Sequence, residues 1–316
     1  MLHMVKLTER PFFKIAKNTL FSFIDDKGLK LSAALAYYTI FSLAPLLLLL
    51  ISLAGIFLGK EATEGRVFEE LNGLIGASAA LQIQDMIRAV ELAGKSNIAL
   101  VIGILTLILG ATSIFAEIQD SINLIWKVKA KPEKGWLKII RDRLLSGSII
   151  ISLGFLLVVS LIVNGAILAM MDRLSRILPE MTVLLASGIN TVISFLVIAV
   201  LFGTIFKVLP DARVPWRDVR TGAFFTACLF LLGRYLIGLY IAKTATGSAF
   251  GAAGSLIVVL VWIYYTAVIL YMGAEFTRVY AEYKGELIRP ADYAVAVIHK
   301  EVEQEVDVLP KQHEDL

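Results

Sequence analysis

Charged residues are scarce in this chain of 316 residues. Only 18% are Asp, Glu, Lys or Arg, whereas 58% are hydrophobic; soluble domains carry about 25% charged residues. This composition excludes an ordinary water-soluble globule, a disordered chain and a basic nucleic-acid-binding arm. The 30 basic residues nearly balance the 27 acidic ones, so the net charge of +3 indicates no polyanionic partner. Information on function must therefore lie in where the few charges fall.

Cysteine and histidine are nearly absent as well. The single Cys228 excludes an intramolecular disulfide and any multi-cysteine metal site. The three histidines, His3, His299 and His313, all lie in the terminal segments and form no metal-ligand motif. The chain has no P-loop, no Gly-x-Ser-x-Gly elbow and no Cys–His pair. We therefore expect no enzyme, no cofactor and no metal site.

Long uncharged runs are what the chain has in abundance. A helix of about 20 apolar residues crosses a bilayer core, because every backbone N–H and C=O must be paired within lipid. Six segments meet or approach that length, and Arg234 is the one charge inside any of them. They are 31–59, 98–116, 144–171, 181–206, 221–242 and 249–274. The sequence predicts an all-α, polytopic membrane protein with six transmembrane helices.

Lys and Arg are distributed unequally between the connecting segments. Segments 1–30, 117–143, 207–220 and 275–316 carry 22 of them, whereas 60–97, 172–180 and residue 243 carry seven. Because basic loops stay on the cytoplasmic side, this asymmetry predicts that both termini lie in the cytoplasm. The chain is expected to cross its membrane several times.

The connecting segments suggest a simple organisation around a six-helix membrane domain at 31–280. Segment 1–30 is expected to be cytoplasmic, with an amphipathic helix on the membrane surface over residues 11–24. Segment 60–97 is expected to form an outer helical hairpin, and 281–316 an acidic cytoplasmic tail.

Basic residues cluster in the loop at 127–143. We expect this loop to attract anionic lipid headgroups, at about 1 kcal/mol per basic residue near the surface. The alternative is a plain positive-inside anchor with interfacial Trp residues. Only Trp126 and Trp136 are close enough to stack on bases, so no nucleic acid is expected as a partner. Oligomerisation is left open.

Ionisable and hydroxyl-bearing side chains at the ends of spans are candidates for a polar pathway, because such groups are costly near lipid. The candidates are Tyr37, Tyr38, Glu117, Asp120, Arg234, Tyr264, Tyr271 and Glu275. One hypothesis is a cavity in which Glu275 or Glu117 binds a cation or exchanges a proton. The alternative is that Glu275 pairs with Arg278, three residues on, and that the other acids are ordinary interfacial ions. Arg234 is expected either to snorkel outward along its helix or to pair with the protein interior, through a structural partner or around an anionic solute.

Several motifs occur in order along most of residues 20–285. They are Tyr37-Tyr38 with Ser42-Leu43-Ala44-Pro45, then Asn123-Leu124-Ile125-Trp126, then Leu209-Pro210-Asp211-Ala212-Arg213-Val214-Pro215-Trp216-Arg217 with Gly222-Ala223, then Phe250-Gly251-Ala252-Ala253-Gly254-Ser255, then Trp262-Ile263-Tyr264-Tyr265 with Gly273-Ala274-Glu275. In these motifs the chain resembles the YihY/BrkB family of six-helix inner-membrane proteins. The resemblance implies a multi-pass protein of the bacterial cell inner membrane. The chain departs from the family at Phe250, where Tyr is frequent, and near Ala111-Thr112-Ser113, where Trp is frequent.

The resemblance implies structural roles for eight motif residues. They are Pro45, Pro210, Trp216, Gly222, Gly251, Gly254, Trp262 and Gly273. Its functional implication is limited, since the family combines links to virulence, a suggestion of transport and a former label of ribonuclease BN. The His-x-His-x-Asp-His cluster of zinc-dependent nucleases does not occur in this chain, which disfavours the nuclease. We expect transport or export of a small solute, anionic or proton-coupled. The alternative is a non-transporting scaffold or envelope-integrity and virulence factor.

Overall fold

A computed structural model describes residues 11–58, 64–65, 67–69, 71–72, 80–85, 87, 113–131, 179–244, 251–286 and 288–298. The expected third span at 144–171, most of the second at 98–116 and much of the expected hairpin at 60–97 lie outside these residues. The same holds for most of the basic loop, for Phe250, and for the sequence after residue 298.

Helices dominate the described residues. They are α2 (Pro11–Asp25), α3 (Gly28–Leu58), α8 (Pro179–Val208), α9 (Trp216–Thr244) and α10 (Gly251–Tyr283). A further helical segment covers residues 113–125. The four long helices have 29 to 33 residues, or about 44 to 50 Å at 1.5 Å per residue, which exceeds the thickness of a bilayer core.

Three of the described helices have the length and apolar composition to cross a membrane. The qualifying stretches are Thr191–Val208, Trp216–Ile237 and Ile257–Tyr283. They correspond to the fourth, fifth and sixth expected spans. Large apolar side chains remain exposed along them, among them Val192, Leu196 and Val200 on α8 and Tyr235 and Leu236 on α9. Such exposed apolar flanks fit contact with lipid.

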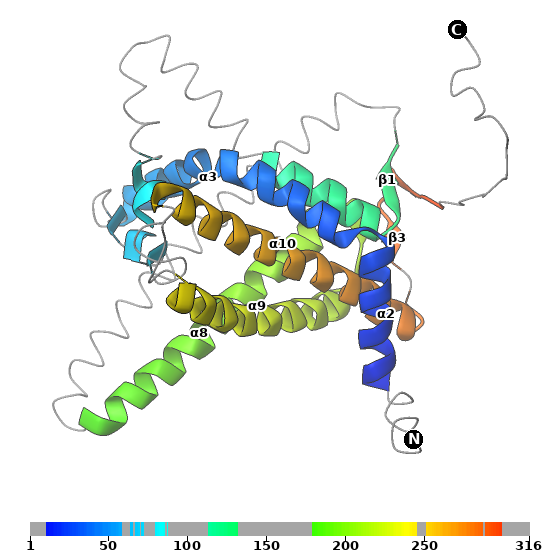
Figure 1. Cartoon of the computed structure of the whole chain (residues 1–316). Helices are drawn as coiled ribbons and strands as arrows, with labels where there is room; N and C mark the ends of the chain where they lie inside the picture. Colours follow the sequence, from blue (N-terminus) through cyan, green and yellow to red (C-terminus); the bar gives the residue numbers. More distant parts are fainter. Residues whose placement is uncertain are drawn as a thin grey trace, which may run out of the picture.

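The helices pack around α10, which contacts α9, α3 and α2, while α8 packs on α9. Figure 1 shows α3 and α10 running beside each other, with α2 crossing one end of this pair. Buried side chains from α10, α8 and the 113–125 helix form the main core, including Ile122, Ile125, Phe206 and Tyr271.

Prolines and tryptophans of the motifs lie at definite points of this arrangement. α3 runs through Pro45 without ending, whereas α8 ends at Val208, two residues before Pro210. Trp216 opens α9, and the Lys207 ammonium lies 5.6 Å from its ring. The Trp262 ring packs edge-on against Phe230 with centroids 6.0 Å apart.

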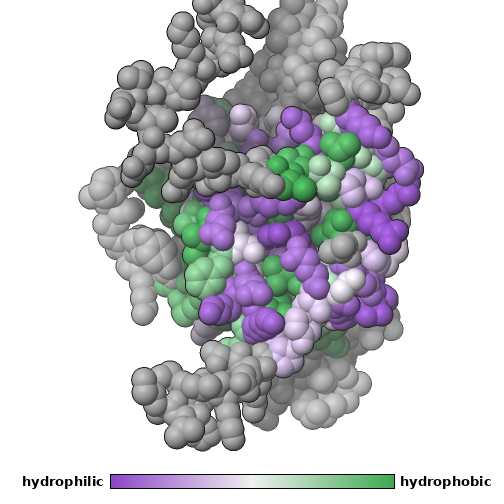
Figure 2. All heavy atoms as spheres, turned by 90° about the vertical axis from the view of Figure 1, so that its right-hand side faces the viewer, coloured by the Kyte–Doolittle hydropathy of each residue, from purple (hydrophilic) through white to green (hydrophobic). Residues whose placement is uncertain are grey.

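Two small antiparallel ladders cover the end of the bundle that α2 crosses, which we call the capped end. Strand β1 (Val128–Ala130) pairs with β4 (Ala294–Ala296), and β2 (Ala212–Arg213) pairs with β3 (Arg289–Pro290). Residues 288–298, the strap, thus connect the loop after residue 125 with the link between α8 and α9. Within the expected tail at 281–316, this stretch is folded onto the bundle. In Figure 2 the capped end shows hydrophilic and hydrophobic side chains interspersed.

Glycines allow α9 and α10 to approach closely. A Cβ on Gly222 would overlap the Thr277 hydroxyl, and a Cβ on Gly273 would overlap the Thr226 hydroxyl. Each Thr hydroxyl donates to the carbonyl of the Gly one turn earlier in its own helix, at 2.7 Å in both cases. The two antiparallel helices therefore make the same contact twice, in opposite directions. Small residues of this kind are typical of helix contacts in membranes.

Candidate functional site

Charged side chains from three elements meet at the capped end. Arg278 on α10 donates from Nη2 to Glu275 Oε2 at 2.8 Å and to Asp26 Oδ2 at 3.4 Å. Its Nη1 lies 3.5 Å from Glu282 Oε1, and Lys127 forms an ion pair with the other oxygen of Asp26. We call these five residues the Arg278 network. It holds two cations and three carboxylates.

Two helix ends bring the network together from distant parts of the sequence. Asp26 lies in the turn between α2 and α3, and Lys127 follows the helix at 113–125. The residue next to Asp26, Lys27, has φ 57°, and Lys127 has φ 56°. Non-glycine residues in this left-handed region are uncommon and each costs about 1 kcal/mol or more. The chain accepts that cost twice where the network is assembled.

Trp126 joins one of these helix ends to α10. Its side chain is 4% exposed, and the indole Nε1–H donates to the Ala274 carbonyl at 3.0 Å. Ala274 lies one turn before Arg278 on α10. The bond therefore holds Lys127, the next residue after Trp126, close to Arg278. Trp126 is thus a buried contact between two helices.

Glu275 is the most unusual member of the network. Its side chain is fully buried, with 0% exposure, although it carries an ionisable carboxyl. Oε2 accepts from Arg278, whereas Oε1 has no hydrogen-bond partner among the described residues. A buried carboxylate oxygen left without a partner is costly, by about 1 to 3 kcal/mol or more. Such an atom marks Glu275 as a candidate functional group.

Further polar groups extend from Glu275 along the helices. Tyr271, one turn earlier on α10, is 0% exposed, and its hydroxyl also lacks a hydrogen-bond partner among the described residues. Ser121 on the 113–125 helix is buried and lies 3.5 Å from Glu117 Oε1. Two neighbouring helices thus contribute polar side chains to the same region of the bundle.

This polar region continues to α3. The Ser42 and Ser113 hydroxyls are hydrogen-bonded at 2.8 Å. Ser113, Glu117 and Ser121 are spaced four residues apart, so they lie on one face of their helix. We use the name polar seam for Ser42, Ser113, Glu117, Ser121, Tyr271 and Glu275, which lie between otherwise apolar helices.

A second polar cluster holds the capped end in place. The Asp211 carboxylate, 1% exposed, accepts from Asn123 Nδ2 at 2.9 Å and from Gln119 Nε2 at 3.2 Å. The Asp211 N–H donates to Asn123 Oδ1 at 2.8 Å. Its carbonyl accepts from Ala291 N of the strap at 3.0 Å. This cluster ties the 113–125 helix, the α8–α9 link and the strap together.

The structure brings some of the predicted pathway residues together and separates others. Glu117, Tyr271 and Glu275 lie in the polar seam. Tyr37 and Tyr38 are 61% and 46% exposed on α3, where they contact each other edge-on at 5.9 Å.

Three other candidates are not members of the seam, although Asp120 lies close enough to Glu117 and Tyr271 to act on both electrostatically. Asp120 is exposed, and Arg234 and Tyr264 are half-buried on α9 and α10. Asp26, Lys127 and Arg278 are functional candidates that the pathway prediction left out. The only signal for Asp26 is its place at a helix break, in Asp25-Asp26-Lys27-Gly28.

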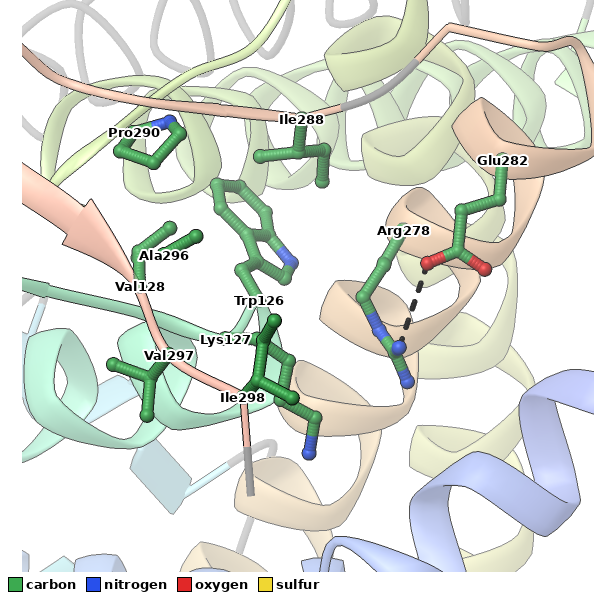
Figure 3. A pocket seen from close by; sticks show the side chains of 10 residues that line it. All are labelled: Trp126, Lys127, Val128, Arg278, Glu282, Ile288, Pro290, Ala296, Val297 and Ile298. Atoms are coloured by element: carbon green, nitrogen blue, oxygen red, sulfur yellow. Dashed lines mark hydrogen bonds and ion pairs between the residues drawn. The ribbon is translucent and has the colours of Figure 1, made fainter. Parts of the chain in front are cut away.

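A pocket of about 420 Å³ opens beside the network and is shown in Figure 3. Trp126, Lys127, Arg278 and Glu282 line it together with the strap residues Ile288, Pro290 and 296–298. We call this pocket the vestibule. It lies within the size range of ligand pockets, which is about 300 to 1,000 Å³.

Long apolar helices with exposed apolar flanks, and ion pairs gathered at one capped end, define a helical multi-pass membrane protein. Residues 19–295 match the family model described as Virulence factor BrkB. The chain belongs to this family, as its motifs predicted, and is a bacterial multi-pass membrane protein.

Relatives carry the name UPF0761 membrane protein. One from Alkalilimnicola ehrlichii is 29% identical over 266 residues, which cover 82% of this chain and 56% of the relative. One from Yersinia pestis and one from Yersinia pseudotuberculosis are each 25% identical over 203 residues, covering 62% of this chain and 64% of the relative. The chain thus matches between about half and two thirds of the length of these relatives. No solved structure matches it.

Proposed function

We propose that this protein is a proton-coupled transporter of a small solute in the bacterial inner membrane, with six transmembrane helices and both termini in the cytoplasm. The observation that carries the proposal is the fully buried Glu275, whose Oε1 has no hydrogen-bond partner among the described residues. Ionisable groups within apolar helices are expensive, and in membrane proteins they are typical of ion and proton pathways.

The surroundings of Glu275 give it two possible states. With Arg278 at 2.8 Å the ionised carboxylate is partly neutralised. A proton would neutralise the same carboxyl when Arg278 moves away, because a buried charge without a partner is unstable. A side chain that is stable in either state, depending on a neighbour that can move, is suited to carrying a proton.

The polar seam offers a route for that proton between the helices. Its members are hydroxyls and carboxyls, each of which can donate or accept a hydrogen bond in turn. Glu275 and Tyr271 are one turn apart on α10, and Ser121, Glu117 and Ser113 follow at one-turn intervals on the neighbouring helix. The Ser42–Ser113 bond connects this row with α3. We assign Glu117 as the second proton-exchanging group.

Two further expectations belong to this proposal. We infer that the chain is not an enzyme and takes no metal or cofactor, since its sequence carries no catalytic or metal-ligand motif. Anionic lipid headgroups are proposed to contact the basic loop at 127–143, which would keep the capped end at the cytoplasmic surface.

Reconstituted liposomes with a pH-sensitive dye in the lumen test the proposal. A small-molecule extract of bacterial cytoplasm, freed of macromolecules by filtration, is added outside. The parent protein should change the luminal pH at a rate that depends on the extract, and Glu275→Gln should abolish the change because an amide cannot carry the proton. Glu286→Gln is the matched control, since Glu286 contacts Arg217 at 3.6 Å outside the Arg278 network. Equal rates and equal pH dependence for the parent and Glu275→Gln would refute the proposal and favour the scaffold.

A further inference from the structure

The vestibule combines two cationic side chains with apolar walls. Lys127 and Arg278 line it together with the Trp126 ring, and the strap contributes Ile288, Val297 and Ile298. In Figure 3 the Lys127 ammonium and the Arg278 guanidinium extend toward the same side of the pocket, and Glu282 lies at the opposite edge from Lys127. An acidic group attached to an apolar body would satisfy both kinds of surface.

Exposure within the network indicates which groups a ligand would meet. The side chain of Lys127 is 38% exposed, whereas Asp26 and Glu275, which pair with the cations, are 11% and 0% exposed. Arg278 is 15% exposed. Lys127 and Arg278 line the vestibule whereas Asp26 and Glu275 do not, so an entering ligand meets these two cations before those two carboxylates. Glu282, 49% exposed, also lines the vestibule and contacts Arg278 at 3.5 Å.

Charge balance determines how the network responds to an entering anion. The network already holds three carboxylates for two cations. A carboxylate ligand paired with Lys127 or Arg278 competes with Asp26 and Glu275 for the same N–H donors. Glu275 is wholly buried and cannot turn to water, so an uncompensated charge there would be the most costly in the network. Taking up a proton from solvent removes that charge.

We propose that the vestibule binds a small organic carboxylate with an apolar body, and that this anion displaces Arg278 from Glu275, which then takes up one proton. This inference rests on the proposed function and names its substrate class as an organic acid carried with a proton. The negative charge of the ligand is balanced by the proton, so anion and proton enter the protein as a neutral pair.

Other titratable groups also face the Glu275 region and influence this proton uptake electrostatically. They are Asp26 from the α2–α3 turn, Lys127, Glu117 and Asp120 from the 113–127 segment, and Tyr271, Arg278 and Glu282 from α10. Of the carboxyls that pair with Arg278, Glu275 is the one that is both fully buried and already without a partner at one oxygen among the described residues. The proton is therefore assigned to Glu275.

Calorimetry tests the inference. Sodium benzoate is titrated into the purified full chain, which is held in nanodiscs of zwitterionic lipid. Titrations near pH 7 in two buffers of different protonation enthalpy give the number of protons taken up per benzoate bound. The parent should bind benzoate saturably and take up about one proton. Glu275→Gln should still bind benzoate but take up essentially no protons, and retained binding shows that this variant is folded.

Lys127→Gln should weaken benzoate binding by about tenfold, the effect of one charge-assisted hydrogen bond. Lys129→Gln, an exposed neighbour, should change binding less than twofold.

Several outcomes overturn the inference. They are no saturable binding, unchanged proton uptake in Glu275→Gln, and equal effects of Lys127→Gln and Lys129→Gln. Loss of benzoate binding in nanodiscs of anionic lipid would assign the vestibule to a lipid headgroup instead. If the liposomes show coupled flux but benzoate does not bind, this inference fails while the proposed function stands. If benzoate binds with proton uptake and no flux occurs, the carboxylate site stands and the transport proposal fails.

Discussion

Replacing Asn123 with Ala should destabilise the protein more than the loss of any single side-chain contact at its surface. The change removes the 2.9 Å bond to the Asp211 carboxylate and the 2.8 Å bond from the Asp211 N–H. Asp211 is 1% exposed, so water cannot replace the lost donors. A hydrogen bond to a charged group contributes about 1.5 to 3 kcal/mol, and an orphaned buried N–H costs about 1 to 3 kcal/mol. Together these predict a loss of about 3 to 5 kcal/mol.

Reversible unfolding in mixed detergent and SDS micelles measures this loss as a free energy of unfolding. Asn18→Ala on the exposed side of α2 is the matched control and should lie within about 0.5 kcal/mol of the parent. Asp211→Ala combined with Asn123→Ala should be less destabilised than the sum of the single changes, because the double variant leaves no orphaned carboxylate. A loss below about 1 kcal/mol for Asn123→Ala, or strict additivity in the double variant, would show that the cluster does not hold the capped end together.

Two further predictions concern packing and the strap. Gly222→Ala should lower the free energy of unfolding by about 1 to 3 kcal/mol, because the new methyl group overpacks against Thr277. Adding Thr277→Ala should restore most of that stability in the same unfolding assay. If it does not, the clash lies elsewhere. In a Cys228→Ser background, cysteines at Ala130 and Ala294, which are opposite partners in the β1–β4 ladder, should form a disulfide under mild oxidation and lose maleimide labelling. Efficient cross-linking only after a two-residue shift of one cysteine would contradict this register.

The long helices could be predicted from the sequence because their signal is local. Uncharged runs of about 20 residues require backbone pairing within the segment, and α8, α9 and α10 follow the expected fourth to sixth spans. The pairing of Glu275 with Arg278 also followed from spacing, since residues three apart on a helix are neighbours. Helical spacing places Tyr271 one turn from Glu275 for the same reason.

The rest of the site could not be predicted because it depends on contacts between distant segments. Asp26 reaches Arg278 across 252 positions in the sequence, and the Trp126 indole reaches the Ala274 carbonyl across 148. Hydropathy and charge counts contain no information on such pairs. Tyr37 lies near the end of an expected span, which made it a candidate for the polar pathway. The rotation of α3 nevertheless leaves its side chain exposed. The strap was beyond prediction as well, because ladders of two and three residue pairs leave almost no periodic signal.

The paired Gly–Thr contacts restrict how this protein can move. Gly222 against Thr277 and Gly273 against Thr226 interlock at two successive turns, so sliding α10 along α9 by even a fraction of a turn would drive a hydroxyl into backbone. The α9–α10 hairpin is therefore a single mechanical unit. Any change of shape between states must then occur at its borders with α2, α3, α8 and the 113–125 helix. The Asp26 contact with Arg278 and the Trp126 bond to the Ala274 carbonyl cross these borders.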